Sequence, residues 1–313
     1  MMVAGVLVLV VALIALLVLW SARAARAATA LVPPDGRFID VPGARLHYID
    51  AGSDTGSGPP IVLVHGLGGH SRNFTYALTE RLTPHHRVLI VDRPGSGHSR
   101  WTGPTDWRIG THATIIARFI AALGIDRPLL VGHSLGGAIS LAVALDHPEA
   151  VRALALIAPL TLPVDTVPDL HKPLMIRSAL LRRVIAWTVA IPLAKSQGRR
   201  AVEAVFAPEP APADFETRGG GALTTRPSGI IAVSSELVAV GDDMPHMAQR
   251  YAALNLPVGI IYGREDQVLD CAHQGEDAAK LIPGCDLTVI PGGHMIPVTA
   301  PDTVADWILS RAR

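Results

Sequence analysis

Residues 132–137 read Gly-His-Ser-Leu-Gly-Gly, and the serine at their centre is the first candidate for chemistry. An apolar run precedes the turn at 129–131, and a helix-like stretch follows at 138–145. A serine on a tight turn between a strand and a helix is typical of a nucleophile elbow, whose strained backbone exposes the hydroxyl above a sheet. Side chains at Gly132 and Gly136 would collide with neighbouring backbone. The pattern predicts that Ser134 attacks an acyl carbon.

A serine hydroxyl is a poor nucleophile near neutral pH, so it needs a histidine base, which in turn needs an orienting carboxylate. Two expected strands late in the chain lead directly to such side chains. The strand at 257–262 is followed by Glu265 and Asp266, with Asp270 a little further on, and the strand at 286–290 is followed by His294. Open α/β sheets place their sites at the carboxyl ends of parallel strands. His294 is therefore the predicted base, and the three carboxylates compete as its partner.

Backbone donors for a developing oxyanion are also predicted. The continuous apolar run at 61–64, typical of a parallel strand covered on both faces, leads into His65-Gly66-Leu67-Gly68-Gly69. The N–H groups of Leu67 and Leu135 are expected to face the oxyanion, where one such donor lowers the barrier by about 3 kcal/mol. Gly66 and His133 are included as substrate-contacting positions, although the His133 side chain should point away from the pocket.

These segments together resemble the α/β-hydrolase superfamily, and in particular its small esterase-like and lipase-like members with a serine nucleophile. The matching segments occur in the family's order and cover roughly residues 37–158 and 250–313. They are His65-Gly66-Leu67-Gly68-Gly69, Asp92-Arg93-Pro94-Gly95-Ser96-Gly97-His98-Ser99, Gly132-His133-Ser134-Leu135-Gly136-Gly137, Gly263-Arg264-Glu265-Asp266 and Gly293-His294.

The resemblance implies an α/β-hydrolase fold with a mostly parallel, doubly wound sheet and a Ser134–Asp266–His294 triad. Asp266 is preferred as the acid because it matches the family's Gly-x-x-Asp spacing, counted from Gly263. Similar haloalkane dehalogenases and epoxide hydrolases need a carboxylate nucleophile where this chain has serine. Residues 159–248 contain no tyrosine to protonate an opening epoxide, so neither activity is expected.

Composition narrows the functional classes. The chain has 313 residues, and its 27 Lys and Arg balance 27 Asp and Glu, so charge indicates no nucleic-acid partner. The two cysteines, Cys271 and Cys285, cannot form a disulfide framework; their spacing would permit one bridge, but we interpret them as unrelated buried thiols. No cluster of histidine and cysteine has the spacing of a metal site, so we expect neither metal nor cofactor.

The N-terminus is a candidate membrane segment. Residues 1–20 carry no charge, and twenty helical residues span about 30 Å, the hydrocarbon thickness of a bilayer. Trp20 lies where an interfacial aromatic would, and Arg23 and Arg26 follow. We expect a single-pass transmembrane anchor at 1–20, and the positive-inside rule favours the cytoplasmic side for the enzyme.

A cleaved signal peptide is the alternative, with weak Ala-Arg-Ala cleavage sites at 22–24 and 25–27 and a secreted or periplasmic product. Against it, the apolar stretch is longer than the usual core of about 7–15 residues, and no basic segment precedes it.

The remaining pattern divides the chain into segments. A linker is expected at 21–36, the first part of the core at 37–158, a cap or lid at 159–248 and the second part of the core at 249–313. An opening antiparallel pair is expected at 38–41 and 45–49, and strands at 61–64, 88–91, 129–131, 153–157, 257–262 and 286–290; a helix is expected at 111–123. An amphipathic stretch at 175–193 lies in the cap. Its apolar side chains, from Leu174 to Val189, are expected either to pack the cap onto the core or to line an acyl pocket.

The sequence therefore predicts a membrane-anchored serine hydrolase of carboxylic esters, with thioesters or lactones as further substrates. An acyltransferase or perhydrolase would use the same triad. A carbon–carbon bond hydrolase would also use it, with Arg177, Arg182 or Arg183 of the cap holding a substrate carboxylate. A non-catalytic binding protein on the same fold is the alternative from another class. Composition indicates nothing about the oligomeric state.

Overall fold

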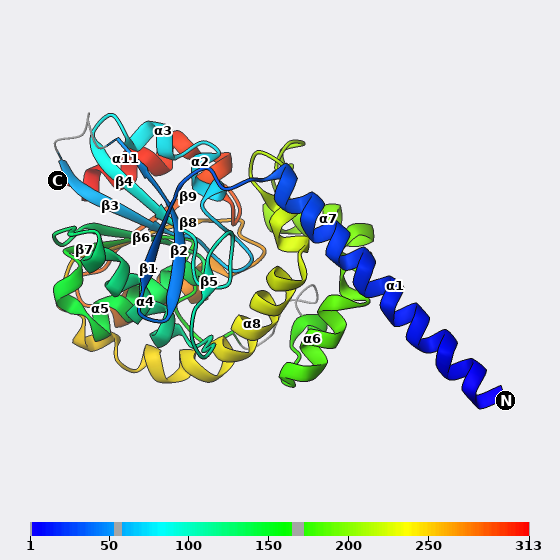
Figure 1. The fold of residues 1–313 in the computed structure, drawn as a ribbon. Helices are drawn as coiled ribbons and strands as arrows, with labels where there is room; N and C mark the ends of the chain where they lie inside the picture. Colours follow the sequence, from blue (N-terminus) through cyan, green and yellow to red (C-terminus); the bar gives the residue numbers. More distant parts are fainter. Residues whose placement is uncertain (1, 53–57, 165–171, 313) are drawn as a thin grey trace.

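The computed structural model describes residues 2–52, 58–164 and 172–312 (Figure 1). In this part of the chain nine strands form one sheet in the order β1-β2-β4-β3-β6-β7-β8-β9, with β5 paired to β2. The strands are β1 (Arg37–Val41), β2 (Ala44–Ala51), β3 (Gly58–Val64), β4 (His86–Val91), β5 (Arg100–Trp101), β6 (Leu129–His133), β7 (Ala153–Ile157), β8 (Val258–Gly263) and β9 (Asp286–Ile290).

The strand directions confirm the predicted fold class. β4, β3, β6, β7, β8 and β9 pair in parallel, and β1 and β2 form the expected antiparallel opening. The β1–β2 turn contains Gly43 at a φ of 98°, a conformation that glycine adopts without strain. The short strand β5 was not predicted, because two residues carry no periodic signal.

Alternate residues of the central strands enter different cores on the two faces of the sheet. Val62 and Val64 of β3 belong to the cluster covered by α4 (Ile109–Ala122) and α5 (Leu135–Asp146). Ile61 and Leu63 belong to the cluster covered by α11 (Pro301–Arg311) and the α2–α3 segment. Burial on both faces explains the continuous apolar runs that the sequence shows. The smaller helices of the core are α2 (Arg72–Thr75), α3 (Thr79–Leu82), α9 (Ala278–Leu281), α10 (Ile296–Thr299), η1 (Pro148–Ala150), η4 (Tyr251–Ala253) and η5 (Ala272–Asp277).

The segment between β7 and β8, which we call the cap (residues 159–248), is helical in the described residues. It contains η2 (Lys172–Leu174), α6 (Ala179–Trp187), α7 (Ala190–Phe206), η3 (Gly221–Thr225) and α8 (Pro227–Ala248). The amphipathic stretch at 175–193 falls on two helices, α6 and the start of α7. The break is at Thr188, whose backbone (φ −116°, ψ −84°) departs from helical geometry.

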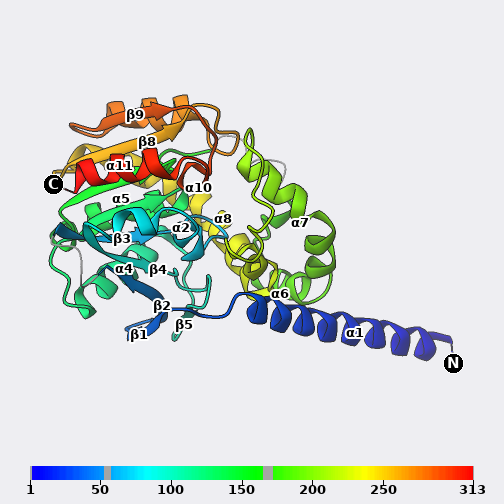
Figure 2. The ribbon, with the colours of Figure 1, turned by 90° about the horizontal axis from the view of Figure 1, so that it is seen from above.

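The N-terminal segment differs from the expected anchor followed by a linker. One helix, α1, runs from Met2 to Leu31, and Figure 2 shows it beside the cap with its N-terminal part projecting away from the molecule. Ser21, Ala24 and Ala28 are buried, and Ala28 and Val32 pack on Ala222 and Leu223 of η3. Alanine is the best helix former, and its small side chain allows close approach, so this Ala-rich stretch continues the helix.

The residues after α1, which we call the strap (residues 32–36), are tied to the core. His98 Nε2 donates to the carbonyl of Val32 at 3.0 Å, and Arg72 Nη2 donates to the carbonyl of Pro33 at 3.0 Å. The N–H of Gly36 donates to His47 Nε2 at 3.1 Å. The strap is therefore fixed at three points between α1 and β1.

Candidate active site

Ser134 lies at the junction of β6 and α5 in a conformation that few non-glycine residues adopt. Its φ is 54° and its ψ is −122°. Its N–H donates to the carbonyl of Ile157 at 3.0 Å, and its own carbonyl accepts from the N–H of Leu160 at 3.0 Å. Such strain persists only where the surroundings impose it, and it is concentrated at functional sites.

The glycines of the turn are required by close backbone packing. A Cβ on Gly132 would lie 2.4 Å from the carbonyl oxygen of Gly136, and a Cβ on Gly136 would lie 2.1 Å from the carbonyl oxygen of Val64. No side chain fits at either position. The turn therefore has the geometry predicted for a nucleophile elbow.

The loop after β3 lies directly against the serine. A Cβ on Gly66 would be 2.8 Å from the Cβ of Ser134, so residue 66 must be glycine for the loop to approach this closely. In the described part of the chain, the N–H groups of Leu67 and Leu135 have no intramolecular acceptor. Unpaired donors beside a serine, one of them at a helix N-terminus, suit a developing negative charge.

His294 and Asp266 are brought together by the loops that follow β9 and β8. His294 Nδ1 is 2.7 Å from Asp266 Oδ2, and both side chains are almost fully buried. Asp266 Oδ1 accepts from the N–H groups of Val268 and Leu269 at 2.8 and 3.0 Å. Because the carboxylate accepts from Nδ1–H, the other ring nitrogen of His294 is left unprotonated and able to take a proton.

The competing carboxylates are engaged elsewhere. Glu265 Oε2 accepts from the N–H of Gly292 at 2.6 Å, and Asp270 Oδ2 accepts from the N–H of His273 at 3.1 Å. Geometry thus distinguishes Asp266 from its neighbours. Ser134 Oγ has no hydrogen-bond partner among the described residues, and catalytic hydrogen bonds often tighten only when substrate binds.

The His133 side chain supports the loop of His294. The centre of its ring is 4.9 Å from that of the His294 ring, and its Nε2 donates to the His294 carbonyl at 3.1 Å. Burial, together with the neighbouring His294, lowers the pKa of His133 to about 3, so this ring is a neutral donor. Its side chain is committed to that contact, which leaves only the backbone of His133 as a candidate substrate contact.

A cap residue that the sequence did not indicate also holds this loop. The carboxylate of Glu209 accepts from the N–H of Gly293 at 3.1 Å, and a Cβ on Gly293 would lie 2.3 Å from the carbonyl oxygen of Ala207. Phe206 of α7 packs with Met295 in the same small cluster. The cap is therefore in direct contact with the residues on both sides of His294.

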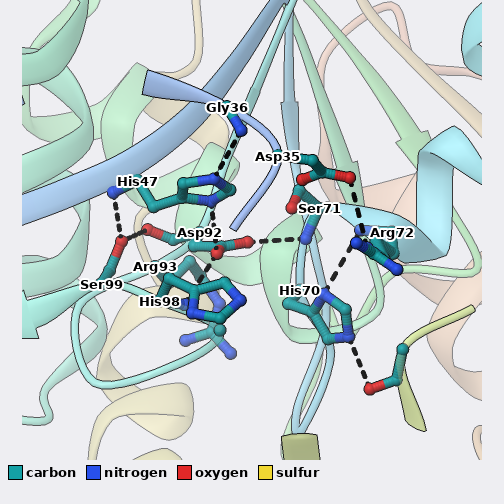
Figure 3. Close-up of polar contacts among 12 residues, drawn as sticks. Asp35, Gly36, His47, His70, Ser71, Arg72, Asp92, Arg93, His98 and Ser99 are labelled. Carbon is teal, nitrogen blue, oxygen red and sulfur yellow. Dashed lines mark hydrogen bonds and ion pairs between the residues drawn. The ribbon is translucent and has the colours of Figure 1, made fainter. Parts of the chain in front are cut away.

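A second buried Asp–His pair lies near the strap and has a different character (Figure 3). Asp92 Oδ2 is 2.9 Å from His47 Nδ1, and Asp92 also accepts from the N–H groups of Ser71 and His98 at 2.7 and 2.9 Å. Burial raises the pKa of Asp92, but the hydrogen bond from His47 outweighs burial and holds this pKa below its usual range. The Nε2 of His47 is occupied by the N–H of Gly36, so this pair has no free base. Asp92 therefore caps backbone amides.

The loop that carries Gly66 is held by the residue after Asp92. Arg93 Nε donates to the carbonyl of His65 at 3.0 Å, and Arg93 Nη2 donates to the carbonyl of Gly66 at 2.9 Å. His65 Nε2 accepts from the N–H of Arg93 at 2.9 Å, and burial lowers the pKa of His65 well below its ordinary value. His65 is thus a neutral brace of this loop.

The structure disagrees with both expected roles for part of the apolar side chains at 174–189. Leu180 is 74% exposed, and Leu181, Val184 and Val189 are about half-exposed, so these four neither pack on the core nor line a closed pocket, whereas Leu174, Ile176 and Ile185 are partly buried. In the described residues no three histidine, cysteine or acidic side chains are placed to hold a metal ion. Cys271 and Cys285 are unpaired.

Comparison with known proteins identifies the family. The family described as "alpha/beta hydrolase fold" matches residues 59–301. The chain is 30% identical over 294 residues to haloalkane dehalogenase 2 of Mycobacterium tuberculosis, which covers 90% of this chain and 96% of that protein. It is 28% identical to lipase 3 of Moraxella sp., which covers 85% of this chain and 80% of the lipase.

A solved membrane phospholipase A is similar in structure, with a TM-score of 0.70 and 24% identity, over 99% of this chain and 96% of the phospholipase. That coverage includes α1. The geometry around Ser134 and these similarities lead to one conclusion: the chain belongs to the alpha/beta hydrolase fold family.

Proposed function

We propose that this protein is a membrane-anchored serine hydrolase of carboxylic esters. The observation that carries the proposal is the pairing of a strained serine at a strand–helix turn with a buried Asp266–His294 hydrogen bond of 2.7 Å. Ser134 is the nucleophile, His294 the base, and Asp266 the carboxylate that holds the imidazole tautomer. The oxyanion binds to the N–H groups of Leu67 and Leu135.

The reaction follows from these roles. Ser134 Oγ adds to the ester carbonyl while His294 takes its proton, and the carbonyl electrons move onto the oxygen that the two N–H groups face. The alcohol leaves with the proton from His294. Water then adds to the acyl-enzyme with His294 again as base, which releases the acid and restores the serine.

The similarity to a haloalkane dehalogenase does not carry that activity to this chain. Displacement of a halide from carbon by a carboxylate gives an alkyl ester, which water can cleave. Displacement by Ser134 would instead give an alkyl ether, which this site has no means of hydrolysing. The serine therefore favours acyl chemistry.

The cap arginines do not favour the carbon–carbon hydrolase alternative. Arg182 is buried and donates to Ser234 Oγ, Ser235 Oγ and the carbonyl of Ile176. The Arg177 side chain is 76% exposed and lies 3.9 Å from Asp242. Arg182 is thus already engaged, and Arg177 and Arg183 are exposed, so none of the three supports this alternative.

Membrane anchoring is proposed from α1. It has a mean hydropathy of 3.3 over its most apolar window, and none of that window is buried in the protein. A cleaved signal sequence has the same composition. However, Ser21 and Ala24 are buried, and cleavage after residue 24 or 27 would remove both. This packing supports a retained helix, with the cytoplasmic side favoured by Arg23 and Arg26.

The test is hydrolysis of a series of nitrophenyl esters, from short to long acyl chains, by the full chain in detergent, with Ser134→Ala as the comparison. We expect the variant to lose the activity, because the nucleophile is absent, while folding normally. Equal activity of the two proteins across the series would contradict the proposal. An ester-inactive native protein would turn attention to a specialised acyl acceptor or a binding role.

A further inference from the structure

Helix α6 exposes most of its large apolar side chains and buries an arginine. Its buried residues are Arg182 and Ala186. Arg182 Nη1 donates to Ser235 Oγ at 2.7 Å, and Arg182 Nη2 donates to the carbonyl of Ile176 at 2.6 Å. A surface helix of a soluble protein places its apolar stripe toward the core, so the orientation of α6 is the reverse of the usual one.

The exposed apolar side chains continue from α6 into α7. We call this set the outer cap face: Leu180, Leu181, Val184, Trp187, Val189 and Leu193, which are 36–74% exposed. Leu180, Val184 and Trp187 follow one another at the spacing of one helical face, and soluble monomers rarely leave such an apolar face uncovered unless something binds it. The outer cap face therefore needs an occupant.

The length of α1 indicates what that occupant is. Residues 2–16 are exposed, as are Leu19 and Trp20, and the helical stretch from residue 2 to residue 20 spans about 28 Å, close to the roughly 30 Å of a bilayer core. Within that stretch Leu17 and Val18 are half-buried against the protein, and Ser21 and Ala24 just beyond it are buried. α1 contacts both α6 and α7, and Figure 2 shows α6 beside it. A bilayer that α1 spans must therefore reach the level of the cap.

Charge on the same part of the cap suits a lipid surface. Between residues 172 and 203 the sequence has one acidic residue, Glu203, and a set of basic residues: Lys172, Arg177, Arg182, Arg183, Lys195, Arg199 and Arg200. Arg183 and Arg200 are exposed. Arg182 is buried, and Arg177 and Arg199 lie near Asp242 and Glu203, so Arg183 and Arg200 are the arginines offered to a ligand. Exposed apolar side chains accompanied by arginine are the composition of an interfacial helix that binds anionic headgroups.

We propose that the outer cap face lies in the headgroup and upper acyl region of the same bilayer that α1 spans. The occupant is lipid, with anionic headgroups against the arginines. This inference rests on the proposed anchoring by α1. In this arrangement α1 and the cap bind the membrane together. The cap also contacts the His294 loop, so the active site would lie at the surface where lipid-like esters reside.

The direct test places a fluorophore on the outer cap face of the full chain in vesicles of phosphatidylcholine with a minor share of phosphatidylglycerol. Val184→Cys carries a nitrobenzoxadiazole label, and Leu281→Cys is the matched control, because Leu281 is also an exposed apolar residue (48%) but lies on α9 of the core. Burial raises the pKa of both native thiols to about 11, so the introduced cysteines label selectively near neutral pH. The readout does not depend on activity.

We expect doxyl-labelled lipids to quench the label at position 184 several-fold more strongly than at 281, and aqueous iodide to do the reverse. Equal quenching by iodide at both positions would overturn the proposal. A blue-shifted label at 184 that lipids do not quench, and that changes with the protein-to-lipid ratio, would also overturn it and indicate a second copy of the chain as the occupant.

An activity measurement separates this inference from the proposed function. The double variant Leu180→Asp, Val184→Asp should hydrolyse a soluble short-chain ester at the native rate but lose several-fold on a long-chain ester embedded in the vesicles. Unchanged activity on the embedded ester would contradict the membrane contact. If the native chain hydrolyses neither ester, the ester function fails while the quenching result still decides the membrane contact.

Discussion

The Asp266 carboxylate is buried and shared between one side chain and two backbone amides. We expect Asp266→Asn to lower kcat by about 10⁴-fold, because an amide can donate to Nδ1 and so stabilise the wrong imidazole tautomer. Steady-state hydrolysis of a short-chain ester measures the effect. Asp270→Asn is the control, since the Asp270 carboxylate accepts locally from the N–H of His273, and comparable losses in the two variants would remove the special role of Asp266.

Glu209 is proposed to position the loop of His294 from the cap. We expect Glu209→Ala to lower kcat by about tenfold with little change in KM, because losing the bond to the Gly293 N–H lets His294 move out of position. This effect is smaller than the loss of a catalytic group. The Glu209 side chain acts only as an acceptor in this bond, and the glutamine carbonyl oxygen can also accept, so Glu209→Gln should recover most of the rate. A variant that instead changes only the melting temperature would show a purely structural role for Glu209.

Among individual site residues, the sequence predicted those that lie within contiguous motifs. Ser134, Gly132 and Gly136 share one turn, so their spacing encodes the elbow. Glu209 left no such signal, because it meets Gly293 across 84 residues and through a cap whose fold depends on tertiary contacts. The occupied Nε2 of His47, which excludes the Asp92 pair as a second base, is likewise visible only in three dimensions.

Between elements, a buried ion pair joins the core to the cap. Arg93 and Glu236 of α8 are essentially inaccessible to solvent, and Arg93 Nη2 donates to Glu236 Oε2 at 3.1 Å, with Nη1 on the other oxygen. We expect Glu236→Ala to lower the free energy of unfolding by about 3–5 kcal/mol, because Arg93 would stay buried without a counter-charge.

Chemical denaturation of the full chain in detergent measures this loss. Glu203→Ala breaks the exposed Arg199–Glu203 pair of α7 and should cost no more than about 0.5 kcal/mol. Similar small losses for the two variants would show that the buried pair is not what holds the cap on the core.

Element boundaries were predictable where a single period governs a segment. The central strands and α4 follow this rule, since the spacing of apolar residues along each element matches the side chains that it buries. The predicted linker at 21–36 and the predicted roles of the apolar side chains of α6 were wrong, because tertiary contacts decide both. The helix at residues 21–31 exists because small residues pack on η3, and α6 has its apolar stripe outward, so its amphipathic pattern did not tell which side faces the protein.

For the molecule as a whole, buried histidines predict sensitivity to acid. Burial lowers the pKa of His65, His70, His112 and His133, the last to about 3. The unfolded chain binds these protons below about pH 6.5 while the folded chain does not, so stability is complete above that pH and is lost as the pH falls. His133 alone should lower the free energy of unfolding by about 2 kcal/mol at about pH 5.

Denaturation midpoints recorded across this pH range measure the slope. Substitution of His133 by phenylalanine removes one titrating group while keeping an aromatic ring near Phe74, so it should flatten the acid side of the curve. An unchanged slope in the variant would show that the imidazole at position 133 does not report the acid transition.

The strap fixes α1 to the core through Val32, Pro33 and Gly36, and the helix end is packed on η3 as well. With α1 in a bilayer, such a connection leaves the catalytic domain little freedom to tumble, unlike a domain on a flexible tether. The height of Ser134 above the lipid plane is then a constant of the molecule. Encounter with a lipid-soluble substrate becomes a lateral search in two dimensions, and lengthening the strap with glycine and serine would convert it back into a search in three.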